Sequence, residues 1–154
     1  MKRRIVAASL SVSALLLTSS AAGAISVKAA GKQYVADVAS ANEALKAFDS
    51  EINAWSNSTA DAEGERQAAS VLAALRTTQK NLLSQTWPRF VRGGVRFICE
   101  EDISSLEEDL QEIDGNSSLG NGAFQLTFRA DSRTLDSDSF YIRKDLGLPS
   151  TGAF

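Results

Sequence analysis

The sequence of 154 residues has 16 basic and 19 acidic residues, giving a formal charge of −3 at neutral pH, and it contains no histidine and one cysteine. Without histidine, the usual general base near neutral pH and the commonest transition-metal ligand are missing, so serine–histidine and cysteine–histidine catalysis are excluded in their usual forms. A single cysteine excludes an internal disulfide framework. The acidic balance argues against nucleic acid or an anionic bilayer as the principal partner.

The first 24 residues have the three parts of a secretory signal peptide. Residues 2–4 are basic, residues 5–17 are mainly apolar, and residues 22–24 read Ala-Gly-Ala, a typical cleavage pattern. We expect cleavage after Ala24. The alternative is an uncleaved anchor, but the apolar run is shorter than the roughly 20 residues that span a bilayer. Cleavage would change the formal charge from −3 to −6, because three of the 16 basic residues leave and all 19 acids remain.

The residues that follow are enough for one domain with a single buried core. We expect a flexible lead over residues 25–32, a helical bundle over residues 33–149 and a loose tail over residues 150–154. The clearest helical periodicity spans residues 33–55, and such a stripe must be buried against other helices. Its apolar residues recur at steps of three and four, at Val38, Ala41, Leu45, Phe48, Ile52 and Trp55.

The residue pair Trp87-Pro88 predicts a helical hairpin. A second helix is expected over residues 59–86, with Gln79 as a polar interruption of its apolar side. Proline disfavours the helical conformation of the residue before it and is well tolerated at the first helical position. The second helix should therefore end at Trp87, and the third should start at Pro88.

The third helix, over residues 88–113, carries one apolar stripe through Val91, Val95, Ile98 or Cys99, Ile103, Leu106, Leu110 and Ile113. Gly93 and Gly94 each weaken its start by roughly 1 kcal/mol relative to alanine, which favours a start at Val95. Residues 114–116, Asp-Gly-Asn, form a fitting stop. We interpret Cys99 as a buried small hydrophobic residue, and an intermolecular disulfide or a reactive thiol is the alternative.

The charges of the third helix are segregated, with arginines near its amino end and acids along the rest, an order that opposes the helix dipole. Bases on neighbouring helices or solvent counterions are expected to compensate the acids, and an outside partner is the remaining alternative. Paired carboxylates can carry acid–base chemistry, but the apolar stripe leaves most of these acids facing water. The charged residues taken as a candidate interaction surface are Arg89, Arg92, Arg96, Glu107, Glu108, Asp109 and Glu112.

The last segment fits two patterns. Residues 124–130 alternate between apolar and polar as in a strand, and a helical stripe also runs through Phe124, Phe128, Leu135, Ile142 and Leu146. We choose the helix, because a lone strand among helices has no partner for its backbone hydrogen bonds. Arg129 and Arg133 are then expected to lie level with the acids of the third helix. The predicted fold class is all-α, an up-down antiparallel four-helix bundle.

The ending Arg143-Lys144-Asp145-Leu146-Gly147-Leu148-Pro149, together with Trp87-Pro88 between alanine-rich helices behind a signal sequence, resembles small exported helical proteins and lipoproteins of actinobacteria. These proteins are largely uncharacterised. The chain departs from many of them in lacking a lipid-attachment cysteine. The resemblance implies a helical bundle that is secreted or held in the bacterial cell envelope, and it carries over no activity or site residues.

Two functions remain open. The first is a non-enzymatic exported bundle that acts by contact with a protein or the envelope, without nucleic acid and without a membrane span after signal cleavage. The second is a carrier of an apolar ligand between the helices, with Trp55, Trp87, Phe90 and Phe97 near a cavity mouth. No enzymatic activity, cofactor or metal is expected. A residue pattern like a calcium loop begins at Asp114, but it lacks the required glycine and bidentate glutamate.

Overall fold

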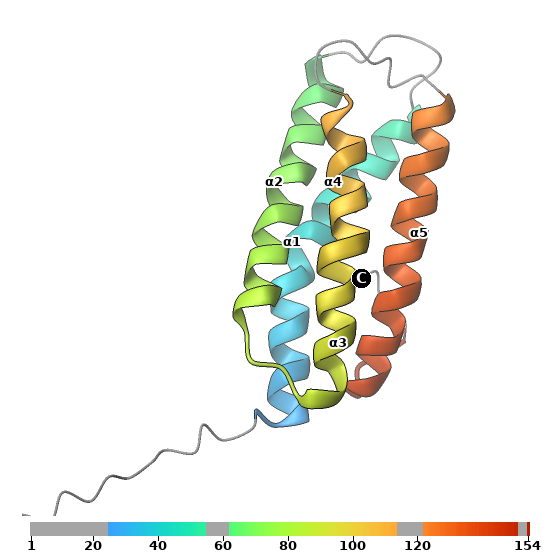
Figure 1. Ribbon diagram of the computed structural model, residues 1–154. Helices are drawn as coiled ribbons and strands as arrows, with labels where there is room; N and C mark the ends of the chain where they lie inside the picture. Colours follow the sequence, from blue (N-terminus) through green and yellow to red (C-terminus); the bar gives the residue numbers. More distant parts are fainter. Residues whose placement is uncertain (1–24, 55–61, 114–121, 151–153) are drawn as a thin grey trace, which may run out of the picture.

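The computed structural model describes residues 25–54, 62–113, 122–150 and 154. Within these ranges the chain forms no strands and has the helices α1 (Val27–Ala54), α2 (Ala62–Ser84), α3 (Arg89–Phe97), the π-helical segment η1 (Ile98–Asp102), α4 (Ile103–Gln111) and α5 (Gly122–Asp145). Because α3, η1 and α4 continue into one another, the described chain has four helical rods in up-down antiparallel order (Figure 1). The predicted all-α four-helix arrangement is confirmed.

Several predicted features lie outside the described residues: the signal peptide over residues 1–24, Trp55, the stop at residues 114–116 and most of the loop after it. No helix in the described ranges combines the length and the apolar character that crossing a membrane requires.

Helix α1 begins at Val27, so most of the predicted flexible lead is helical. The hydroxyl of Ser26 accepts a hydrogen bond of 3.2 Å from the backbone N–H of Ala29, which caps the helix. Gly31 lies so close to Leu148 that an added Cβ would be 3.2 Å from its Cδ2 atom. Close to this contact Ala30 and Gly31 are buried, whereas the first turn, Val27 to Ala29, is exposed.

The hairpin at Trp87 and Pro88 is confirmed, since α2 ends at Ser84 and α3 starts directly after Pro88. The indole of Trp87 is 4% exposed, donates a hydrogen bond of 2.6 Å to the Leu82 carbonyl, and packs edge-on against Tyr34. The predicted later start of the third helix at Val95 is wrong. The two glycines are helical, and an added Cβ on Gly94 would be 3.1 Å from Ile142 on α5.

The choice of a helix for the last segment is confirmed by α5. Its end is a Schellman motif, in which Leu148 N–H donates to the Arg143 carbonyl and Gly147 N–H to the Lys144 carbonyl. Gly147 has φ +68°, the left-handed conformation that glycine adopts without strain. We predicted a loose tail over residues 150–154, but Phe154 is buried.

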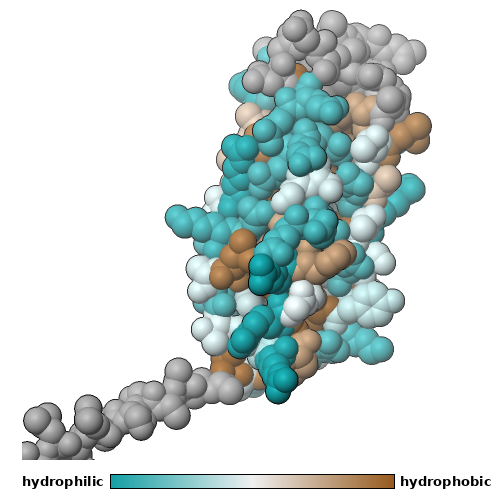
Figure 2. Space-filling model, in the orientation of Figure 1, coloured by the Kyte–Doolittle hydropathy of each residue, from teal (hydrophilic) through white to brown (hydrophobic). Residues whose placement is uncertain are grey.

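The four rods do not all pack equally closely against their neighbours. Helix α1 packs along α2, and the third rod packs against both α2 and α5. In Figure 1, α1 runs obliquely behind α4 toward the start of α5. Between α1 and α5, contact is made by side chains such as Phe48 and Phe128, whose rings meet edge-on at 5.2 Å. The face of the bundle that is turned to the viewer in Figure 2, with α1 behind it, is mainly hydrophilic.

Candidate functional site

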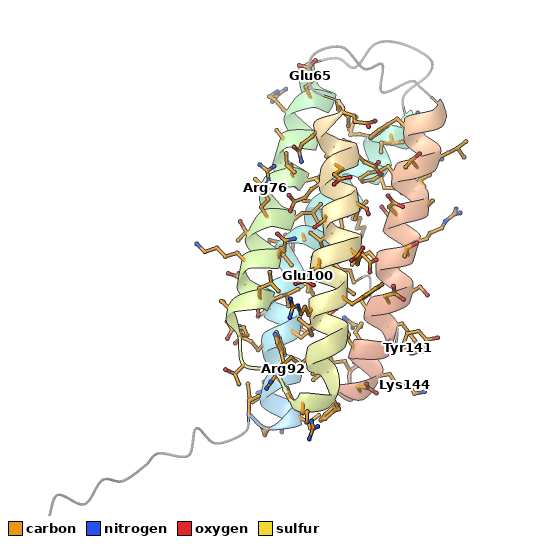
Figure 3. The ribbon with its side chains drawn as sticks, in the orientation of Figure 1. Glu65, Arg76, Arg92, Glu100, Tyr141 and Lys144 are labelled. Atoms are coloured by element: carbon orange, nitrogen blue, oxygen red, sulfur yellow. The ribbon has the colours of Figure 1, made fainter. Side chains whose placement is uncertain are left out.

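The three arginines of the predicted interaction surface lie on α3 and are exposed. Arg92 donates a hydrogen bond of 3.3 Å to the Trp87 carbonyl, and Arg96 forms an exposed ion pair of 2.7 Å with Glu100 one turn later. Figure 3 shows Arg92 and Glu100 on the third rod, with Glu100 farther along it. These arginines therefore form a basic surface at one end of the bundle.

The predicted acids do not join this surface, because they point in different directions. Glu107 faces α2, where it forms an ion pair of 3.1 Å with Arg76, and its side chain is only 13% exposed. Asp109 is half-buried toward α5, whereas Glu108 and Glu112 are exposed. The structure therefore splits the predicted surface into separate groups, and Arg76 of α2 supplies part of the expected compensation from a neighbouring helix.

Arg129 and Arg133 lie on the part of α5 that is level with the acids of the third helix, as predicted, but they lie on the side of α5 that faces α1, so the expected compensation of those acids is wrong. Arg129 lies 3.9 Å from Asp49 of α1, and Arg133 lines the space between α1 and α5. The residues of α5 that interact with the acids of the third rod are themselves acids, Asp131 and Asp138. The sequence indicated how far along α5 these residues lie, but not how the helix is rotated about its axis.

We define the acidic seam as Asp102 and Asp109 on the third rod with Asp131 and Asp138 on α5. Burial raises the pKa of Asp102 to about 6, and Asp138, the largest charged contributor, adds to the shift. Burial likewise raises the pKa of Asp109 to about 6, with Asp131 as the main charged contributor. An oxygen of each shifted carboxyl, Oδ2, is buried without a hydrogen-bond partner in the described chain.

Most of the acids of the third rod face water, as predicted, since Glu100, Glu101, Glu108 and Glu112 are exposed. The acidic seam contains two exceptions, Asp102 and Asp109. Asp102 is 6% exposed. The sequence contains a signal for this seam. Asp102 and Asp109 are seven residues apart, as are Asp131 and Asp138, and this spacing places each pair on one face of its helix. No group of three or more potential metal ligands is found among the described residues.

Cys99 lies in the π-helical turn and is fully buried, as predicted. Burial raises the pKa of its thiol to about 12, and the charge of Glu100 adds to this effect. Since the thiolate is the nucleophilic form, the thiol is unreactive near neutral pH. The alternative of a reactive thiol is therefore disfavoured.

An aromatic stripe lies on the outside of α3, and we define it as Phe90, Gly93 and Phe97. The two phenylalanines are 57% and 51% exposed and stand seven residues apart, so they share one helical face. Gly93 between them borders open space. Trp87 is instead buried in the core, so the described aromatics do not surround a common cavity mouth as the carrier hypothesis predicted.

A groove of about 810 Å³ lies between α1 and α5, and we call it the α1–α5 groove. Its apolar lining comes from both helices, and its basic residues outnumber its acidic ones. The charged and apolar residues that line it are Leu45, Phe128, Leu135, Lys46, Arg129, Arg133, Arg143, Glu43, Asp49 and Asp136. The sequence prediction missed this site, because no motif marks it and its two walls lie at opposite ends of the chain.

Two buried residues stand out here: Arg143, which lines the α1–α5 groove, and Phe154, which is hydrogen-bonded to two lining residues, Asn42 and Asp136. Arg143 is only 8% exposed although it is charged, and its Nε donates a hydrogen bond of 3.1 Å to the Pro149 carbonyl. Phe154 is 1% exposed and is fixed by its backbone, since its carbonyl accepts from Asn42 at 3.0 Å and its N–H donates to Asp136 at 3.1 Å.

Comparison of the chain with protein-family models, with curated proteins and with solved structures gives no match.

Proposed function

We propose that the chain is an exported, non-enzymatic helical-bundle protein of the bacterial cell envelope or medium, and that it acts by protein contact through the aromatic stripe of α3. The observation that carries this proposal is the half-exposed pair Phe90 and Phe97 beside three exposed arginines. Aromatic residues and arginine are the types enriched in the centre of protein interfaces. Export itself is supported by the pattern of the first 24 residues.

The chemistry of this surface defines the partner. Each phenylalanine leaves a large apolar area in water, and covering it would stabilise a complex. The arginines beside it favour carboxylates, which they bind with paired hydrogen bonds. We therefore infer a protein partner with an apolar depression bordered by acidic residues. Figure 3 shows Tyr141 and Lys144 on α5 at the end of the bundle where Arg92 lies, and both residues are exposed. They extend the exposed surface at this end.

Site-specific crosslinking in the producing cell tests this proposal. A photoreactive phenylalanine analogue is placed at position 97, and in a matched control it replaces Leu126, which is 73% exposed on α5. The expected result is a discrete protein adduct from position 97 and none from position 126. Equal labelling from both positions, or no adduct from position 97, would overturn contact through the stripe.

A second candidate function, the carrier of an apolar ligand, is favoured by the α1–α5 groove. Its volume of about 810 Å³ falls within the roughly 300–1,000 Å³ of typical ligand sites. The apolar residues Leu45, Phe128 and Leu135 contribute to its lining. Native mass spectrometry of the chain purified without detergent tests this candidate. A mass excess that is lost on denaturation supports a carrier, and a bare mass after exposure to lipid extract counts against it.

A further inference from the structure

Arg143 is a buried positive charge without a negative partner. Among the described residues no carboxylate forms an ion pair with its guanidinium, and its only side-chain hydrogen bond goes to the uncharged Pro149 carbonyl. Burying a charge is costly unless it is paired and hydrogen-bonded. Arginine cannot relieve this cost by losing its proton, because its pKa is too high. Among the described residues, the charge of Arg143 is therefore not compensated by an ion pair.

The other charged side chains that line the α1–α5 groove balance, with three basic and three acidic residues, so Arg143 itself supplies the one positive charge in excess. Four basic side chains and three acidic ones line the α1–α5 groove. Two of the acids already have partners, since Asp49 lies 3.9 Å from Arg129 and Asp136 accepts the Phe154 N–H. A ligand anion would therefore meet an excess of positive charge in this groove, in contrast to the acidic seam on the other side of α5.

The lining of the groove also includes three large apolar residues, one from α1 and two from α5. Leu45 of α1 faces Phe128 and Leu135 of α5 across it, and both α5 residues are buried. A ligand that fits therefore combines an apolar chain with an anionic end.

We propose that the α1–α5 groove binds a single-chain amphiphile with a carboxylate or phosphate head, with the Arg143 guanidinium as the ligand of the head group and the apolar lining as the site of the chain. Arginine suits this role because its planar fork presents paired N–H donors to either anion. Arg133 and Lys46 at the groove add to the positive field but are exposed. This inference rests on the carrier candidate and adds its ligand class.

Equilibrium binding to the mature chain tests the inference, with palmitate, hexadecyl phosphate and hexadecanol as probes of equal chain length. Acetate and inorganic phosphate serve as heads without a chain. We expect palmitate or hexadecyl phosphate to bind at least roughly tenfold more tightly than hexadecanol, and the chainless anions not to bind measurably. The preferred head identifies the source of the anion as a fatty acid or a phosphate lipid.

The variants Arg143→Gln and Arg143→Lys test the assignment of the head group, with Arg96→Gln as the control because Arg96 is an exposed base on α3. Arg143→Gln should remove the preference for the anionic probes and leave hexadecanol binding unchanged. Arg143→Lys keeps the charge but not the fork, and should retain part of the preference. If Arg143→Gln does not fold, the Lys variant and the head-group preference of the unaltered chain still decide the question.

The outcomes separate this inference from the carrier function beneath it. No binding of any long-chain probe overturns the carrier candidate itself. Equal binding of palmitate and hexadecanol leaves the carrier standing and overturns the anion site. Binding of inorganic phosphate as tight as that of hexadecyl phosphate overturns the amphiphile. A head-group preference that persists in Arg143→Gln overturns the role of Arg143.

Discussion

The side-chain amide of Gln79 on α2 donates a hydrogen bond of 2.6 Å to the carbonyl of Cys99 in the π-helical turn. Ser104 donates to the same carbonyl at 3.2 Å. A π turn widens the helix by one residue and leaves backbone groups without their usual partners. Gln79, which interrupts the apolar side of α2 in the sequence, therefore has a structural role, because it satisfies a carbonyl that the irregular turn leaves available.

Replacing Gln79 by leucine should lower the free energy of unfolding by about 1–3 kcal/mol, the usual cost of leaving a buried carbonyl without one of its donors. Urea denaturation followed by circular dichroism measures this. Lys80→Leu is the matched control, because Lys80 is exposed on the same helix. An unchanged unfolding midpoint in Gln79→Leu would show that Ser104 alone satisfies the carbonyl.

The acidic seam predicts that the fold loses stability as pH rises. The pKa of Asp102 is raised from its ordinary value of 3.8 to about 6 by burial and by Asp138, with smaller contributions from Glu101 and Asp131. A carboxyl whose pKa is raised by folding contributes stability that is fully present below its unfolded pKa and is lost as pH passes through the folded value. Stability should therefore fall between about pH 4 and about pH 7.

Asp102→Asn should remove much of this fall and stabilise the chain at pH 7 by on the order of 1 kcal/mol, since the amide carries no charge to bury and can donate to Asp138. Thermal unfolding at pH 4 and pH 7 measures the difference. Glu65→Gln, at an exposed position on α2, should leave the pH profile of the parent chain intact, because Glu65 does not contribute to the raised pKa of Asp102 or Asp109. A destabilised Asp102→Asn at pH 7 would mean that the ionised carboxylate has a stabilising partner, such as a bound cation.

Cys99 should resist alkylation in the folded chain. The thiol is fully buried, and burial raises its pKa to about 12, so both access and thiolate are lacking at pH 8. Iodoacetamide followed by intact-mass measurement should show labelling only after denaturant is added. Rapid labelling of the folded chain at pH 8 would indicate that the π-helical turn opens readily.

The sequence predicted the elements of this fold better than their contacts. Periodicity and Pro88 were sufficient for four helices and for the hairpin, because helix and turn preferences are local. Gly31 near the start of α1 lies close to Leu148, although the two residues are far apart in the sequence. Local patterns do not contain such contacts.

The candidate sites were predicted less well for the same reason. Charge type and spacing are visible in the sequence, but the rotation of α5 decides whether Arg129 or Asp131 meets the third rod. Nothing in the neighbours of Arg143 along the chain indicates that its side chain is buried. Its unusual position follows from the α1–α5 groove, which forms only when the first and last helices are brought together.

Gly93 and Gly94 of α3 are both helical, but their surroundings differ. Alanine is favoured over glycine inside a helix by roughly 1 kcal/mol. An added Cβ at Gly93 meets open space, so Gly93→Ala should raise the free energy of unfolding by about that amount.

At Gly94 an added Cβ would be 3.1 Å from Cγ1 of Ile142, which forces α3 and α5 apart or displaces the isoleucine. Overpacking of this kind typically costs about 1–3 kcal/mol, so Gly94→Ala should be neutral or destabilising. Urea unfolding of the two single variants measures the difference, and each is the control for the other. Equal stabilisation by both would show that α3 does not approach α5 as closely as the structure places it.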